Sequence, residues 1–186
     1  ENMSTAKKVY EEKMGKTINV LKTELNTVRA GRANAAILDQ VKVDYYGTPT
    51  PLKSLANISV PDPRTLMITP FDPKCVGDIE KAIHVSNLGI NPSNDGKNVR
   101  LVIPQLTEER RKELTKVIKA MGEDAKVAVR NCRREANDEI RKLEKDKELT
   151  EDEMHEELNE IQKLTDDCMK DIDTIVADKE KEIMEV

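Results

Sequence analysis

Large aromatic residues are almost missing from this sequence of 186 residues, which has one Phe, three Tyr and no Trp. Because aromatic side chains usually contribute much of a compact core, this chain must bury mainly aliphatic side chains. Lys, Arg, Asp and Glu together make up 36% of the residues. Few aromatics combined with many charges are typical of long helices that pack on one another.

The residues that usually build disulfides, metal sites and catalytic centres are also few. The three cysteines, Cys75, Cys132 and Cys168, are scattered and odd in number, which predicts buried thiols in a reducing compartment. The two histidines, His84 and His155, have no Cys or His nearby at metal-ligand spacing. The glycine-rich phosphate-binding motifs are missing as well. We therefore expect no metal, no cofactor and no enzymatic activity.

Long apolar runs are a further absence. A membrane-spanning helix needs about 18 or more consecutive apolar residues, and the sequence has no such run. Neither a secretory h-region nor an Arg-rich transit segment is visible at the N-terminus. The sequence therefore predicts a cytoplasmic protein without a membrane partner, and it favours a bacterial over an organellar source without deciding between them.

Proline is confined to the middle of the chain, since all eight prolines lie between Pro49 and Pro104. Proline is excluded from helix interiors, so only the outer segments can form long helices. Apolar residues recur there every three or four positions, which predicts helices over about 4–28, 107–143 and 150–183. Thr150 and Glu153 fit a capping box at the start of the third helix. We expect these helices to form a bundle.

The middle segment has a different pattern. Alternating apolar residues predict strands near 41–45, 58–60, 65–71 and 98–104, with a turn at Gly47 and Pro49. Residues 78–89 predict a short helix that ends at Gly89, and residues 91–96 predict a turn. The expected fold class is α+β, a long three-helix bundle with a small α+β module inserted between the first and second helices.

This organisation predicts two domains. Residues 1–30 and 105–186 would form the discontinuous bundle, and residues 31–104 the inserted domain. Both connections would act as hinges, near 29–32 and 103–106. The expected hinge residues are Ala30, Gly31, Pro104 and Gln105.

Charge is distributed unevenly over these segments. Residues 143–186 hold 17 acidic and 6 basic residues, whereas residues 105–142 hold 8 acidic and 11 basic residues. The formal net charge of −5 therefore comes from the third predicted helix. A bundle with one basic and one acidic side would bind nucleic acid in one orientation.

The stretch VAVRNCRREAND, residues 127–138, places Arg130, Arg133 and Arg134 on one side of the second predicted helix. We call these three residues the arginine ridge. Arg130 and Arg133 have no acidic residue three or four positions away, and Arg134 has only Asp138. Lys126, Arg130 and Arg134 also form a like-charge series. The ridge is either a solvated helix face or a surface for phosphate groups, which the guanidinium fork binds well.

Two further arginine pairs are candidates for the same surface. Arg29 and Arg32 flank Gly31, where the glycine could be a helix C-cap and the arginines could simply favour a helix C-terminus. Alternatively they join the ridge. Arg110 and Arg111 are possible additional RNA-binding residues, although acidic neighbours lie close enough to pair with them.

Five stretches together resemble the ribosome recycling factor family: RAGRAN (29–34), VDYYGTPTPL (43–52), LTEERRKEL (106–114), VAVRNCRREAND (127–138) and ADKEKEIM (177–184). The resemblance covers essentially the whole chain. It implies a three-helix bundle with a β/α/β domain inserted after the first helix, in an L shape that mimics tRNA.

The resemblance also implies a function. Such a factor would bind ribosomal RNA of the large subunit after termination. With elongation factor G, which hydrolyses the GTP, it would split the post-termination ribosome into subunits and release mRNA and tRNA. It would act as a monomer without a catalytic site, and its RNA-facing residues would be Arg29, Arg32, Arg130, Arg133 and Arg134. The alternatives are a helical scaffold that binds proteins and a nucleic-acid chaperone without ribosome specificity.

Overall fold

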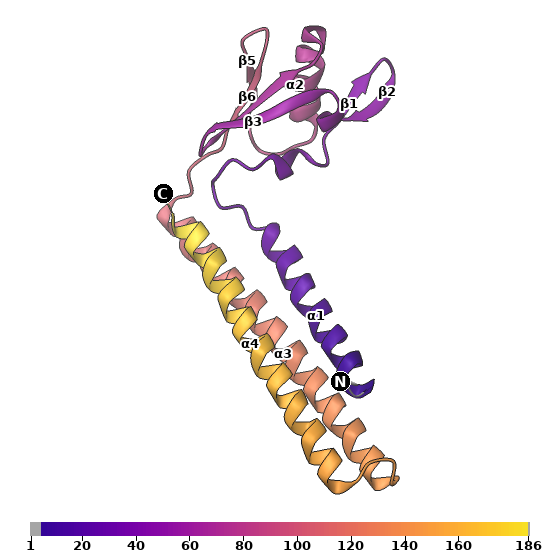
Figure 1. Ribbon diagram of the computed structural model, residues 1–186. Coiled ribbons are helices and arrows are strands. Elements are labelled where there is room, and N and C mark those ends of the chain that lie inside the picture. Colours follow the sequence, from indigo (N-terminus) through magenta and orange to yellow (C-terminus); the bar gives the residue numbers. More distant parts are fainter. Residues whose placement is uncertain (1–4, 186) are drawn as a thin grey trace. The chain divides into compact units, whose positions relative to one another are not determined.

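Three long helices and a small sheet make up the part of the chain that the computed structural model describes, residues 5–185 (Figure 1). The chain folds as two units. One contains the residues up to Arg29 together with Glu108–Glu185, and the other is Ala30–Thr107. The predicted fold class is confirmed, because a mixed helix-and-sheet segment is inserted between the first and second long helices.

The helical unit consists of α1 (Thr5–Asn26), α3 (Glu108–Lys145) and α4 (Glu151–Met184), with α3 antiparallel to the other two (Figure 1). The start of α4 is fixed by the predicted capping box. Thr150 Oγ1 accepts a hydrogen bond from the Glu153 N–H at 3.1 Å, and Glu153 Oε1 accepts one from the Thr150 N–H at 3.0 Å. No helix within residues 5–185 has both the length and the apolar character that crossing a membrane requires.

The bundle core is mainly aliphatic, as the scarcity of aromatics predicts. On α3 the buried positions are Leu114, Ile118, Gly122, Ala125, Val129, Ala136 and Ile140. The apolar spacing along this segment predicts Met121 and Ala128 as core positions, but both are only half-buried, and the neighbouring Gly122 and Val129 are the buried residues. At Gly122 the two long helices approach closely, since a Cβ on this glycine would lie 2.6 Å from Val176 Cγ2.

Tyr10 joins α1 to α3 inside this core. Its hydroxyl donates a hydrogen bond to Glu139 Oε2 at 3.0 Å, and its side chain is 5% exposed. Lys13 Nζ lies 4.9 Å from the centre of the Tyr10 ring and 3.4 Å from Glu135 Oε2. These contacts add a cation–π interaction to the hydrogen bond and fix the register between the two helices.

The Tyr10 contact predicts a loss of stability at alkaline pH. Burial, followed by the hydrogen bond and the charge of Glu139, raises the pKa of Tyr10 from 10.0 to about 12. The neutral phenol is therefore favoured in the folded state, so its stabilisation is complete below pH 10 and is lost as the pH approaches 12. We expect the melting temperature of the wild type to fall more steeply across this interval than that of Tyr10→Phe. If the melting temperatures of the wild type and of Tyr10→Phe fall in parallel as the pH rises, Tyr10 does not have this role.

The inserted unit is built on an antiparallel sheet of β3 (Ala56–Asp62), β4 (Thr65–Pro70), β6 (Val99–Val102) and β5 (Ser93–Asn94), in that order. The helix α2 (Val76–Val85) packs on this unit, and β1 (Lys42–Tyr45) and β2 (Thr48–Pro51) form a separate hairpin. Short 3-10 helices cover Ala35–Leu38, Leu52–Ser54 and Pro73–Cys75. The buried core includes Leu66, Ile68, Ile79, Ile83, Val99 and Leu101.

Several details of the predicted inserted domain were wrong. The helix ends at Val85 instead of at Gly89, and the Ser86 N–H caps it by donating to the Ala82 carbonyl. The turn predicted around Pro49 continues directly into β2, which has only one neighbouring strand and therefore tolerates proline. Part of the turn predicted over 91–96 forms β5.

Candidate nucleic-acid interface

The arginine ridge lies on α3, away from the buried side of that helix. Val129 and Ala136 are fully buried at 0% exposure, so they fix the rotation of α3 and turn the ridge outward. Arg130 and Arg134 are exposed, and no hydrogen bond or ion pair within residues 5–185 engages either side chain. Both guanidinium groups therefore present positive charge that the described protein leaves uncompensated.

Arg133 differs from the other two residues of the ridge because a second helix holds it. It is half-buried, and its Nη1 donates a hydrogen bond to Gln162 Oε1 of α4 at 3.1 Å. Gln162 Nε2 in turn donates to Asp166 Oδ1 at 2.9 Å. The partner of Arg133 is thus a neutral amide, 29 positions away in the sequence.

The like-charge series on α3 is partly neutralised. Lys126 Nζ lies 2.6 Å from Asp173 Oδ1 of α4 and 3.8 Å from Glu123 Oε1. Lys126 therefore adds little free charge beside Arg130, because one acid of α4 and one of its own helix pair with it. The uncompensated part of the series begins at Arg130.

Three basic residues that sequence reasoning did not select lie on the same side of α3. Lys116, Lys119 and Arg141 are exposed, and none has an ion pair with a described residue. Together with the ridge they follow helical spacing from residue 116 to residue 141, a length of roughly 37 Å along the axis. The signal that could have found them is this spacing of three, four and seven positions along one side of the helix.

Arg29 and Arg32 lie beyond the end of α1. The interpretation of Gly31 as a helix C-cap was wrong, since α1 ends at Asn26. The register set by Tyr10 and Glu139 places that end of α1 roughly 10 Å along the bundle from Arg130. Both arginines are exposed, Arg29 in the helical unit and Arg32 in the inserted unit. Their part in RNA binding stays a prediction.

Arg110 and Arg111 are poorer candidates. Arg110 Nη1 lies 2.8 Å from Glu113 Oε2, which is the local pairing that the sequence predicted. Arg111 is half-buried, and its Nε is enclosed without a hydrogen-bond partner in the described chain. Neither guanidinium is as accessible and uncompensated as those of Arg130 and Arg134.

The two connections between the units meet at Gly31. This residue has φ +72°, and a Cβ there would lie 3.2 Å from Leu106 Cγ and 3.5 Å from the Pro104 carbonyl oxygen. A side chain at this position would therefore be strained by its backbone and crowded by the second connection. Glycine is required here by a close approach of two chain segments.

One turn of the inserted unit holds both connections where they enter the sheet. The Ala33 N–H donates to the Pro63 carbonyl at 2.8 Å, and the Ile103 N–H donates to the Arg64 carbonyl at 2.7 Å. Arg64 Nε also donates to the Ile103 carbonyl at 3.1 Å. The β3–β4 turn therefore fixes residues 33 and 103, and only a few residues of each connection lie outside these hydrogen bonds.

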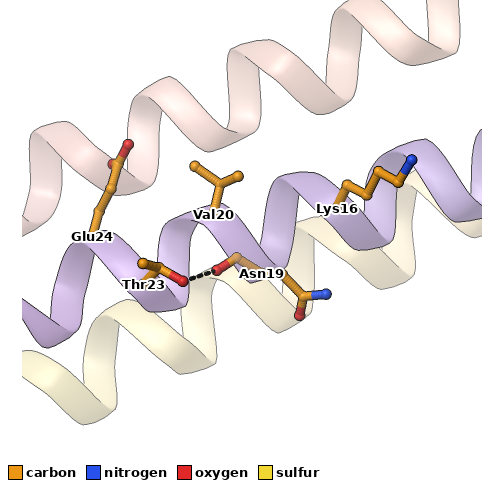
Figure 2. A pocket seen from close by; sticks show the side chains of 5 residues that line it. All are labelled: Lys16, Asn19, Val20, Thr23 and Glu24. Atoms are coloured by element: carbon orange, nitrogen blue, oxygen red, sulfur yellow. Dashed lines mark hydrogen bonds between the residues drawn. The ribbon is translucent and has the colours of Figure 1, made fainter.

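A surface pocket on α1 is not a comparable site. Its lining residues come from a single helix and are Lys16, Asn19, Val20, Thr23 and Glu24 (Figure 2). The Thr23 hydroxyl donates to the Asn19 carbonyl of its own helix at 3.0 Å, as the dashed line in Figure 2 shows. Within residues 5–185 there is also no group of three His, Cys, Asp or Glu side chains that could hold a metal ion.

Comparison with protein families gives a match along most of the chain. The family model described as ribosome recycling factor matches residues 21–184. The ribosome-recycling factor of Alkaliphilus metalliredigens is 56% identical over 179 residues, covering 96% of this chain and 97% of the relative. That of Enterococcus faecalis is 55% identical over 186 residues, covering 100% of this chain and 98% of the relative.

Solved structures give the same result. The solution structure of a ribosome recycling factor matches with a TM-score of 0.75 and 40% identity, covering 97% of this chain and 96% of that one. A second structure describes the T. thermophilus ribosome recycling factor and the E. coli elongation factor G bound to the E. coli post-termination complex. Its recycling-factor chain matches with a TM-score of 0.61 and 44% identity, covering 98% of this chain and 100% of that one.

Proposed function

The chain belongs to the ribosome recycling factor family, and from that premise we propose how its parts act in recycling. The protein recycles the ribosome after translation termination. It binds the large subunit and, with elongation factor G, splits the post-termination complex into subunits, which releases mRNA and tRNA. The observation that carries this function is the identity of more than half of all residues with recycling factors along nearly the whole chain.

The arginine ridge is the surface that we assign to ribosomal RNA. Arg130 and Arg134 offer exposed, uncompensated guanidinium groups on a rigid helix, and such groups bind phosphates without reading base sequence. The segment 143–186 carries 17 acidic residues, so it repels RNA and favours docking through α3. Binding through phosphates also makes the affinity strongly dependent on salt.

The factor supplies binding and leverage, and elongation factor G supplies the energy by hydrolysing GTP. On this proposal the chain acts in the cytoplasm as a monomer and has no catalytic residue or cofactor of its own. The stiff helical unit stays anchored on RNA while the inserted domain, residues 31–104, takes the force from the partner.

The experiment that tests the function is a subunit-splitting assay followed by light scattering. Post-termination ribosomes are mixed with the chain, elongation factor G and GTP. We expect dissociation only when both proteins and GTP are present. Splitting that proceeds without elongation factor G, or no splitting in the complete mixture, would contradict the proposed function.

The hinge assignment to Ala30, Gly31, Pro104 and Gln105 predicts a separate phenotype for Gly31→Val. A β-branched residue at φ +72° is strained by roughly 1–2 kcal/mol and also crowds Leu106. We expect slower subunit splitting with unchanged binding to the large subunit, because the ridge is left intact. Gly77→Ala is the matched control, since a Cβ at Gly77 meets no atom within 4 Å. If Gly31→Val splits ribosomal subunits at the wild-type rate, Gly31 is not part of the hinge.

A further inference from the structure

Gln162 is the feature of α4 that the proposed function leaves unexplained. Its carboxamide lies between the guanidinium of Arg133, at 3.1 Å, and the carboxylate of Asp166, at 2.9 Å. The amide oxygen accepts from the arginine, and the amide nitrogen donates to the aspartate. Both ends of the amide are therefore engaged, which fixes its orientation and, through it, the position of Arg133.

The neutral character of this partner matters for a phosphate-binding residue. A carboxylate in place of the amide would form an ion pair with Arg133 and cancel its charge. The helix that carries Gln162 is rich in acids, and Asp173 does neutralise Lys126 from the same helix at 2.6 Å. At Arg133, by contrast, the nearby carboxylate of Asp166 is bound to the amide.

The contact leaves most of the guanidinium donors of Arg133 available. A guanidinium has five N–H groups; one is donated to Gln162, and the N–H of Nε is enclosed without a partner in the described chain. The remaining donors belong to the terminal nitrogens. Arg133 is thus held by one edge and can still bind an anion with the rest of its fork.

We propose that Gln162 is a positioning residue for RNA binding, which orients Arg133 toward a phosphate group without neutralising it, and that Asp166 orients Gln162. This inference rests on the proposed contact between the arginine ridge and ribosomal RNA. A free arginine side chain must be ordered when it binds, and holding it beforehand removes part of that entropic cost. A purely structural link between α3 and α4 would change stability but not affinity.

The test measures the affinity for isolated large ribosomal subunits at several salt concentrations, together with thermal stability. Arg133→Ala is expected to weaken binding by about tenfold or more, since a charged hydrogen bond is lost. Gln162→Ala should weaken binding by about two- to tenfold, the cost of ordering one long side chain. In the Arg133→Ala background, Gln162→Ala should have no further effect, because the two residues act as one unit.

Gln162→Glu separates positioning from charge. It keeps an acceptor for Arg133 but adds a negative charge, so we expect weaker binding and a salt dependence reduced by about one ion. Asn159→Asp is the matched control, because it adds the same charge to α4 at an exposed position that makes no hydrogen bond to Arg133 in the described chain. The loss with Gln162→Glu should exceed that with Asn159→Asp.

The outcomes distinguish the two proposals. If Arg133→Ala binds like the wild type, the proposed role of Arg133 in RNA binding fails and the role of Gln162 fails with it. If Arg133→Ala weakens binding but Gln162→Ala does not, the RNA contact stands and Gln162 is not a positioning residue. The inference is also overturned if Gln162→Ala lowers the affinity equally in the wild type and in the Arg133→Ala background. The same holds if Gln162→Glu and Asn159→Asp lower the affinity equally.

Discussion

Replacing Arg130, Arg133 and Arg134 together by glutamate is expected to abolish binding to the large subunit at physiological salt. Each arginine that contacts a phosphate contributes about 1.5–3 kcal/mol through a charge-assisted hydrogen bond, and reversal adds repulsion to the loss. The combined loss of affinity should reach roughly a thousandfold or more. Helix content should be unchanged, because Arg130 and Arg134 are exposed and Arg133 has a single hydrogen bond to α4.

A matched variant separates the effect of the ridge on binding from the effect of the net charge. Lys74, Lys81 and Lys97 are exposed lysines of the inserted unit, and their replacement by glutamate changes the net charge by the same amount. We expect this second triple variant to pellet with large subunits nearly as well as the wild type. Equal losses in both variants would show that overall charge, and not the position of the ridge, controls binding.

Gly122→Ala should destabilise the helical unit even though alanine favours helices more than glycine does. A Cβ at residue 122 would lie 2.6 Å from Val176 Cγ2, so α3 and α4 must separate or Val176 must move. Overpacking of this kind costs typically about 1–3 kcal/mol, which outweighs the gain of about 1 kcal/mol in helix propensity. The melting temperature should fall by several degrees, roughly 2–4 °C per kcal/mol for a chain of this size.

Val176→Ala should restore stability to Gly122→Ala, because the pair then keeps nearly the original volume for the close approach. Gly15→Ala is the control in α1, since a Cβ there meets no atom within 4 Å. This substitution should stabilise the helix, because alanine has the higher helix propensity. If Gly122→Ala and Val176→Ala each lower the stability and the two losses add up in the double variant, the close-packing account of Gly122 is wrong.

The long helices could be predicted because their apolar stripes repeat over many turns and the prolines are confined to the middle of the chain. The stripe was misplaced at Gly122, since a glycine contributes no apolar side chain to the pattern although it is the residue that lets α4 approach. The strand β2, Thr48–Pro51, was missed and a turn was predicted at Gly47 and Pro49, because proline is a poor strand residue unless one edge of the strand is unpaired.

The ridge itself could be predicted, because the absence of acids near Arg130 and Arg133 is a property of one helix. The partners from α4 could not be predicted in the same way. Gln162 contacts Arg133 and Asp173 pairs with Lys126 across a bundle interface, and the register of that interface is set by the whole core. Spacing along one helix shows which charges lack local partners, but not which of them a second helix neutralises.

The most direct test of the account is the salt dependence of binding to isolated large subunits by the wild type, Arg130→Ala and Arg100→Ala. Arg100 is an exposed arginine of β6, so its removal changes net charge equally without touching the ridge. If the ridge anchors on phosphates, the logarithm of affinity falls linearly with the logarithm of salt concentration, and Arg130→Ala lowers the slope by about one. Arg100→Ala should keep the wild-type slope. An unchanged slope for Arg130→Ala would contradict the anchoring of this protein on ribosomal RNA through α3.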